Sequence, residues 1–191
     1  ILDKGGLLVL PSGPGLATIK SDFRYYKALK NADLVLFDSG YFCLLLRFLK
    51  NINVQKFSGF KFLKIFLKEF NKKKQKRIYL VEPSTYLQKI NKEYLKKNNI
   101  NNIYQYVAPI YKKNKIYDNK LLKNIKKIKP KYIIINLGGG TQEVLGLYLK
   151  QNLNYKPSII CSGAAISFLT NQQAPLTNLL DNLYISWLVR I

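Results

Sequence analysis

The chain has 191 residues, of which 48% are hydrophobic and 22% are charged, a length and composition that fit one folded domain and exclude a disordered protein. Its formal net charge is +22 and it contains no histidine, which excludes histidine-based catalytic triads and most zinc sites. No apolar run reaches the roughly 18 residues that a membrane-spanning helix needs, so we expect a cytoplasmic protein.

Short apolar runs rich in β-branched residues alternate with amphipathic stretches, a pattern typical of βα units around a parallel sheet. We predict strands at 7–11, 32–38, 77–83, 103–109, 132–138 and 158–164. We predict helices at 19–30, 41–50, 59–71, 84–98, 119–128 and 141–152, and a further short helix after Pro175. The predicted fold class is therefore α/β: a single domain, residues 1–191, with a mainly parallel, Rossmann-like sheet of about six strands flanked by helices.

Lysine supplies most of the positive charge. The arginines are Arg24, Arg47, Arg77 and Arg190, and the other cations are lysines among many Asn, Ile and Tyr residues. That combination is typical of an AT-rich genome, whereas a nucleic-acid reader usually relies on the bidentate fork of arginine. Attraction to an anionic membrane surface and nucleic-acid binding are the alternatives to this compositional interpretation.

Glycine-bearing loops follow four of the predicted strands. They are PSGPG at 11–15, DSG at 38–40, GGGTQE at 138–143 and SGAA at 162–165. In open parallel sheets, ligands collect beyond the carboxyl ends of the strands. Four such loops at one edge predict a ligand site more strongly than any one of them alone.

The loop GGGTQE has the chemistry of a diphosphate site. Gly138, Gly139 and Gly140 let the backbone approach a ligand, and the helix that follows presents free N–H groups at its positive dipole end. Gln142 can then hydrogen-bond a base or sugar, and Glu143 can accept from hydroxyls. The alternative interpretation is a tight strand-to-helix turn with no ligand.

Asp38 ends an otherwise apolar strand, LVLFD. A carboxylate at such a place is solvated or strongly hydrogen-bonded, because burying it unpaired is costly. We consider two roles, a helix cap and a general base.

Five blocks of the sequence, in order and spacing from about residue 7 to 190, resemble the WecB/TagA/CpsF glycosyltransferases, glycosyltransferase family 26. The blocks are ADLVLFDSGYFCLLLRFL, VQKFSGFKFL, PKYIIINLGGGTQEVLGLYL, GAAISFLTNQQAP and ISWLVRI. The resemblance implies an inverting, metal-independent transferase without a cofactor. It would move a sugar, typically of the N-acetylmannosamine type, from a UDP donor to a polyprenyl-diphosphate-linked acceptor in cell-surface polysaccharide synthesis.

The resemblance also implies roles for individual residues. The catalytic base of the family falls on Asp38, its polar residue at the first strand end falls near Ser12, and its basic residue falls on Lys56. Its glutamine falls on Gln142, with Glu143 beside it. Backbone amides from Ser12 and Gly13 onward would help to neutralise the leaving diphosphate, and the gap after 138–140 would hold the nucleotide.

The resemblance further implies a protein peripheral at the inner face of the cell membrane. Family members commonly continue into a basic tail beyond the equivalent of Ile191, so we expect the sequence to be an excerpt that lacks this membrane-docking tail. Ser39, Ser167 and Gln173 depart from the family pattern, and Gly139–Gly140 stand where it has a proline-containing turn, which leaves the donor sugar and acceptor open.

Several other interpretations are kept open. They are a non-catalytic relative that binds nucleotide-sugar, a nucleic-acid-binding module that stacks bases on its aromatic residues, and a generic Rossmann-like enzyme. We regard nucleic acid as the less favoured partner. A homo-oligomer is also left open.

Overall fold

The computed structural model describes residues 1–72, 76–112 and 115–173. The described residues contain one parallel sheet of six strands in the order β2-β1-β6-β5-β3-β4. Its strands are β1 (Gly6–Val9), β2 (Leu34–Val35), β3 (Ile78–Glu82), β4 (Ile103–Val107), β5 (Tyr132–Ile135) and β6 (Ser158–Cys161). The α/β fold class and all six predicted strands are confirmed, whereas the helix predicted after Pro175 lies outside the described residues.

Helices connect these strands and cover the sheet. They are α1 (Gly13–Ala17), α2 (Phe23–Lys30), α3 (Gly40–Lys50), α4 (Gly59–Lys72), α5 (Thr85–Lys97), α6 (Asn119–Ile128), α7 (Thr141–Asn152) and α8 (Ala165–Leu169). The sequence predicted the six longer helices and missed α1 and α8, because five residues are too few to show a helical period. The helix predicted at 19–30 begins at Phe23, since the Asp22 carboxylate accepts from the N–H groups of Arg24 and Tyr25 at 3.1 and 3.0 Å.

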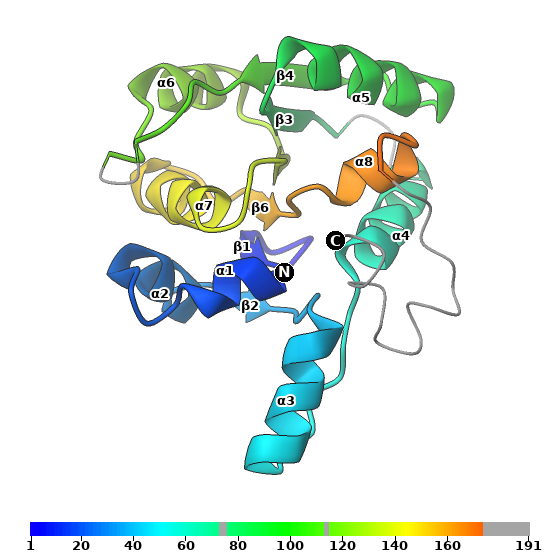
Figure 1. Ribbon diagram of the computed structural model, residues 1–191. Helices are drawn as coiled ribbons and strands as arrows, with labels where there is room; N and C mark the ends of the chain where they lie inside the picture. The colour runs from blue at the N-terminus through cyan, green and yellow to red at the C-terminus, as the bar shows by residue number, and fades with distance from the viewer. Residues whose placement is uncertain (73–75, 113–114, 174–191) are drawn as a thin grey trace.

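Successive side chains of the strands enter two different cores. On one face, residues such as Val81, Ile135 and Cys161 pack with α2, α6 and α7. On the other face, residues such as Leu80 and Ile134 pack with α4, α5 and α8. The sheet is therefore the middle of three layers (Figure 1), which explains why its strands are apolar on both faces.

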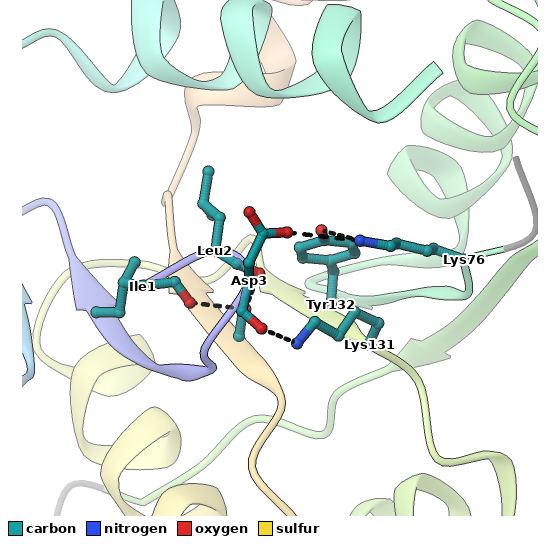
Figure 2. A network of polar contacts seen from close by, with 7 residues as sticks. Ile1, Leu2, Asp3, Lys76, Lys131 and Tyr132 are labelled. Atoms are coloured by element: carbon teal, nitrogen blue, oxygen red, sulfur yellow. Dashed lines mark hydrogen bonds and ion pairs between the residues drawn. The ribbon is translucent and has the colours of Figure 1, made fainter. Parts of the chain in front are cut away.

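The N-terminal segment covers the amino ends of β5 and β3. Lys131 Nζ donates to the backbone oxygen of Asp3, and Lys76 Nζ lies 3.5 Å from the Asp3 carboxylate. Lys76 also donates to the Tyr132 hydroxyl at 3.4 Å, so one acidic residue is linked to two lysines (Figure 2). We call the end of the sheet at which the strands begin the amino edge and the end at which they finish the carboxyl edge; neither name refers to the outermost strands β2 and β4.

Helix α3 is unlike the other long helices because it projects away from the sheet (Figure 1). Only Gly40 and Cys43 of its residues are buried, and Phe48 and Leu49 are 79% and 72% exposed. Within the described ranges, no helix has both the length and the apolar character needed to cross a membrane.

Candidate functional site

The four glycine-bearing loops meet at the carboxyl edge. A Cβ atom on Gly139 would lie 3.4 Å from Ser12 Oγ, and a Cβ atom on Gly13 would lie 3.1 Å from Ser39 Oγ. The N–H of Gly163 donates to Gln142 Oε1 at 2.7 Å. The structure therefore brings together loops that are up to about 150 residues apart in the sequence, because parallel strands deliver their carboxyl ends to one edge.

Asp38 lies where this edge meets the start of α4. Its Oδ1 accepts from the N–H of Gly59, the first residue of α4, at 3.0 Å. A Cβ atom on Gly59 would lie 3.4 Å from Asp38 Oδ2 and 3.6 Å from the Cβ of Ala165 at the start of α8. The half-buried carboxyl group of Asp38 is thus oriented by a backbone donor and placed beside the loop SGAA.

Asp38 does not cap the helix that follows it directly. That cap is Ser39, whose Oγ accepts from the N–H of Phe42 at 3.2 Å. If Asp38 acts as a helix cap, the helix that it caps is therefore α4, which begins 21 residues later in the chain. The role of Asp38 as a general base stays a prediction.

Lys56 is half-buried in the connection between α3 and α4. The backbone N–H of the next residue, Phe57, donates to the oxygen of Phe37 at 2.9 Å, which ties this connection to the end of the second strand. Burial raises the pKa of the Cys43 thiol, the charge of Lys56 opposes that rise and the charge of Asp38 adds to it. The bond from Phe57 to Phe37 therefore brings Lys56 to the strand end that carries Asp38.

Gly138, Gly139 and Gly140 form what we call the glycine turn. Gly138 and Gly139 are exposed, and among the described atoms nothing lies within 4 Å of a Cβ built on Gly138 or Gly140. Gly140 has φ +86°, a backbone conformation that is strained for every residue except glycine. The turn therefore presents bare backbone at the start of α7.

Gln142 and Glu143 lie beneath the glycine turn. Their exposed fractions are 3% and 0%. Glu143 Oε2 accepts from the N–H of Gly140 at 2.7 Å, and Gln142 Nε2 donates to Glu143 Oε1 at 3.1 Å. Glu143 holds the turn directly and Gln142 holds it through Glu143, so the exposed part of the turn is its backbone. Their predicted contacts with a nucleotide stay predictions.

Glu143 has an unusual environment for an acid. Burial raises its pKa to about 7, although hydrogen bonds from the backbone and from Gln142 act in the opposite direction. The hydroxyl of Tyr25 lies nearby, and burial and the charge of Glu143 both raise the pKa of Tyr25. The carboxyl group of Glu143 is therefore about half ionised near pH 7, even though it lies at a helix N-terminus, where the dipole favours the ionised form.

Sequence reasoning missed two polar residues at this edge, Glu82 and Asn136, and gave no role of its own to Ser162 of the loop SGAA. Each directly ends or follows a strand, and each is less than 9% exposed. The signal that singled out Asp38, a polar residue after an apolar run, is also present in RIYLVEP and YIIINLG.

The model of a family described as "Glycosyl transferase WecG/TagA/CpsF family" matches residues 2–191, nearly the whole chain. No curated protein matches it.

Proposed function

The chain belongs to the WecG/TagA/CpsF family of glycosyltransferases and so takes a sugar donor and an acceptor, and from this premise we propose its substrates and mechanism. The donor is a UDP-linked sugar of the N-acetylmannosamine type, and the acceptor is a polyprenyl-diphosphate-linked sugar. The reaction is inverting and needs no metal, and it serves the synthesis of a cell-surface polysaccharide.

One observation carries this proposal: the carboxyl edge brings a carboxylate and an exposed backbone turn together. Asp38 lies beside the loop SGAA, and the N–H of Gly163 in that loop reaches Gln142 beneath the glycine turn at 2.7 Å. A base for the acceptor and donors for a diphosphate are what a transferase without metal requires.

In the proposed reaction, Asp38 takes the proton of the acceptor hydroxyl as that oxygen attacks the anomeric carbon. The new carbon–oxygen bond forms on the face opposite the bond to UDP, and the bond to UDP breaks. This attack from the opposite face inverts the configuration of the anomeric carbon. UDP leaves with the electron pair of the broken bond. Its diphosphate is stabilised by backbone N–H groups of Gly138 and Gly139 and of the Ser12 loop with Gly13. The N-terminus of α7 and the charge of Lys56 add to this stabilisation.

We assign contact with an anionic membrane at the cytoplasmic face to α3. This helix exposes Phe48 and Leu49 at its outer end, where Arg47 and Lys50 are also exposed. Apolar side chains flanked by cations are the combination that lies in the interface of an anionic bilayer. Because α3 begins directly after Asp38 and Ser39, a docked helix would hold the base near a lipid-linked acceptor.

Calorimetric titration of UDP without added metal tests the proposed donor. We expect micromolar binding to the natural chain and weaker binding to Gln142→Ala, which removes the side chain that holds Gly163 to the glycine turn. Gln151→Ala is the matched control, because Gln151 is exposed at the other end of the same helix. Single-stranded oligonucleotide serves as the comparator: oligonucleotide binding without UDP binding would mean that the family fold has kept no donor site.

A further inference from the structure

A row of polar side chains crosses the carboxyl edge on one face of the sheet. Val81 pairs with Ile135, and Ile135 pairs with Cys161, so the residues that follow them stand side by side. These are Glu82 of β3, Asn136 after β5 and Ser162 after β6. Because side chains alternate along a strand, this row lies above the apolar layer of Leu80, Ile134 and Ile160.

Hydrogen bonds join the row to α5. Glu82 Oε2 accepts from Asn91 Nδ2 of α5 at 3.0 Å and from Asn136 Nδ2 at 3.1 Å. Ser162 Oγ donates to Asn136 Oδ1 at 3.3 Å. Glu82 and Asn91 are 0% exposed, so bulk water does not reach them to form hydrogen bonds that neighbouring residues do not form.

Two buried oxygen atoms, one in this row and one in α5, have no hydrogen-bond partner among the described residues. They are Glu82 Oε1 and Asn91 Oδ1. Both atoms are acceptors if Glu82 is ionised, and a buried acceptor without a donor costs about 1–3 kcal/mol. A carboxylic acid and a primary amide, however, pair through two hydrogen bonds, one in each direction. A single proton on Glu82 Oε1 would therefore give both oxygen atoms a partner.

The surroundings of Glu82 favour that proton. The side chains that face its carboxyl group from α5, β4 and β5 are those of Asn91, Gln105 and Asn136, and all three are uncharged amides. Burial raises the pKa of Glu82, although the nearby amides act in the opposite direction. Asn91 and Asn136 do so by donating to Oε2, whereas Gln105 Nε2 donates to the backbone oxygen of Gln88 at 2.8 Å and leaves Glu82 Oε1 without a hydrogen bond from any described residue.

We propose that Glu82 is a neutral carboxylic acid that positions the glycine turn: its O–H pairs with Asn91, and its carbonyl oxygen fixes the amide of Asn136. Asn136 leads by two residues into Gly138, and it also holds Ser162, whose neighbour Gly163 donates to Gln142. The acid is thus connected to the turn through both β5 and β6.

This inference rests on the proposed function for its purpose. A UDP donor brings a diphosphate to the glycine turn, and a buried carboxylate close beneath it would repel that charge. A neutral acid supplies the same hydrogen-bond geometry without a negative charge. Glu82 touches no reacting atom, so it is a positioning residue and not a catalytic one.

Carbon-13 NMR of glutamate-labelled protein tests the protonation state. The chain contains four glutamates, Glu69, Glu82, Glu93 and Glu143, and the Glu82 signal is the one missing from Glu82→Gln. We expect its carboxyl carbon to stay at the acid position at about pH 6, where ordinary glutamates are ionised. A signal at the ionised position would overturn the proposal.

Paired substitutions test the positioning role. Glu82→Gln keeps one donor and one acceptor, so we expect the hydrogen-exchange protection of the Gly163 N–H and the UDP affinity to stay within about twofold of the natural chain. Glu82→Met has a similar length and no hydrogen bonds, and we expect both quantities to fall about tenfold or more. Equal behaviour of the two variants, or an unchanged Gly163 in the Met variant, would overturn the proposal.

Ser162→Ala is a second variant that tests the same role if Glu82→Met does not fold. It cuts the link to Asn136 by removing one hydroxyl, and we expect the same loss of Gly163 protection in a smaller amount. If the natural chain bound no UDP but Gly163 behaved as expected, the proposed function would fail while the positioning role stood. If it bound UDP and the Ser162 and Met variants bound it equally well, the positioning role alone would fail.

Discussion

The pKa values of buried or paired acidic side chains shift in opposite directions at the two edges of the sheet. At the amino edge, Asp33 Oδ2 lies 2.7 Å from Lys150 Nζ. Burial alone would raise the pKa of Asp33, but hydrogen bonds from Lys150 and from the N–H of Leu7 outweigh it, and the pKa lies below its usual value. At the carboxyl edge, burial raises the pKa of Glu82 and Glu143, and their partners are amides and backbone N–H groups.

This difference teaches how a strongly basic protein can organise a site for an anion. Ion pairs at the amino edge attach the ends of the strands to their neighbours. At the carboxyl edge, Glu82 is proposed to be neutral and the pKa of Glu143 is raised to about 7, so these acids hold Asn136 and Gly140 in place with less negative charge than ordinary carboxylates would add where a diphosphate is proposed to bind. The transfer reaction is therefore expected to depend on the carboxyl edge, and the two edges are expected to give stability opposite dependences on pH.

The largest expected effect concerns Asp38. Asp38→Asn keeps an oxygen that can accept from the N–H of Gly59 but removes the base, so we expect the transfer rate to fall by about 10²- to 10⁴-fold. Calorimetry should show an unchanged UDP affinity. Asp33→Asn at the amino edge is the control and should leave the rate unchanged. Undiminished transfer by Asp38→Asn would refute the proposed base and remove the functional contrast between the edges.

The second effect concerns the pH dependence that Glu143 gives to stability. Its pKa rises from 4.5 when unfolded to about 7 when folded, so the folded state binds more protons between these values. Stability is therefore present in full below about pH 4.5 and is lost as pH rises toward 7, by about 3 kcal/mol in total. Urea unfolding of Glu143→Gln across this range should show that this part of the slope has gone. An unchanged slope would mean that Glu143 is ionised throughout.

The sequence predicted all six strands and the edge at which the glycine-bearing loops meet, because both follow from local patterns. Apolar β-branched runs predict strands, and a parallel sheet then requires the loops after them to meet. Ser12 and Gly139 are 127 positions apart in the numbering, yet their contact was implied by that topology.

The sequence could not predict how the side chains at the site are used. The contact of Gln142 with a nucleotide stays a prediction, but its burial and the bond that it accepts from the N–H of Gly163, in another loop, could not be predicted from its own segment. Glu82 was not singled out, because its importance comes from Asn91 and Asn136, which approach it from a helix and a neighbouring strand. Such contacts depend on three-dimensional packing, and the periodicity of one segment carries no information about them.

The third effect is expected at the amino edge. Asp33→Asn removes the charge that faces Lys150 but keeps an acceptor for the N–H of Leu7, so we expect a loss of about 1 kcal/mol near pH 7. Since the pKa of Asp33 is lowered on folding, its contribution is present above the unfolded value and is lost as pH falls, opposite to Glu143. Urea unfolding of the variant at several pH values checks this sign. A loss that grows toward acid pH would contradict the assignment.

The smallest effect is expected for the lysine network of the amino edge (Figure 2). Lys76 lies 3.5 Å from the Asp3 carboxylate, and the two side chains are 32% and 69% exposed, so solvent screens most of their attraction. We expect Lys76→Gln to change the unfolding free energy by at most about 0.5 kcal/mol, measured by urea unfolding at low and high salt.

Lys131→Gln in the same network is the matched control, since Lys131 reaches the backbone oxygen of Asp3 and not its carboxylate. Its effect should be less dependent on salt than that of Lys76→Gln, because its acceptor carries no full charge. If Lys76→Gln cost well over 1 kcal/mol, the amino edge would be a cooperative charge network. The contrast would then lie between two tightly coupled edges, and the surplus of lysine would be needed for the fold itself.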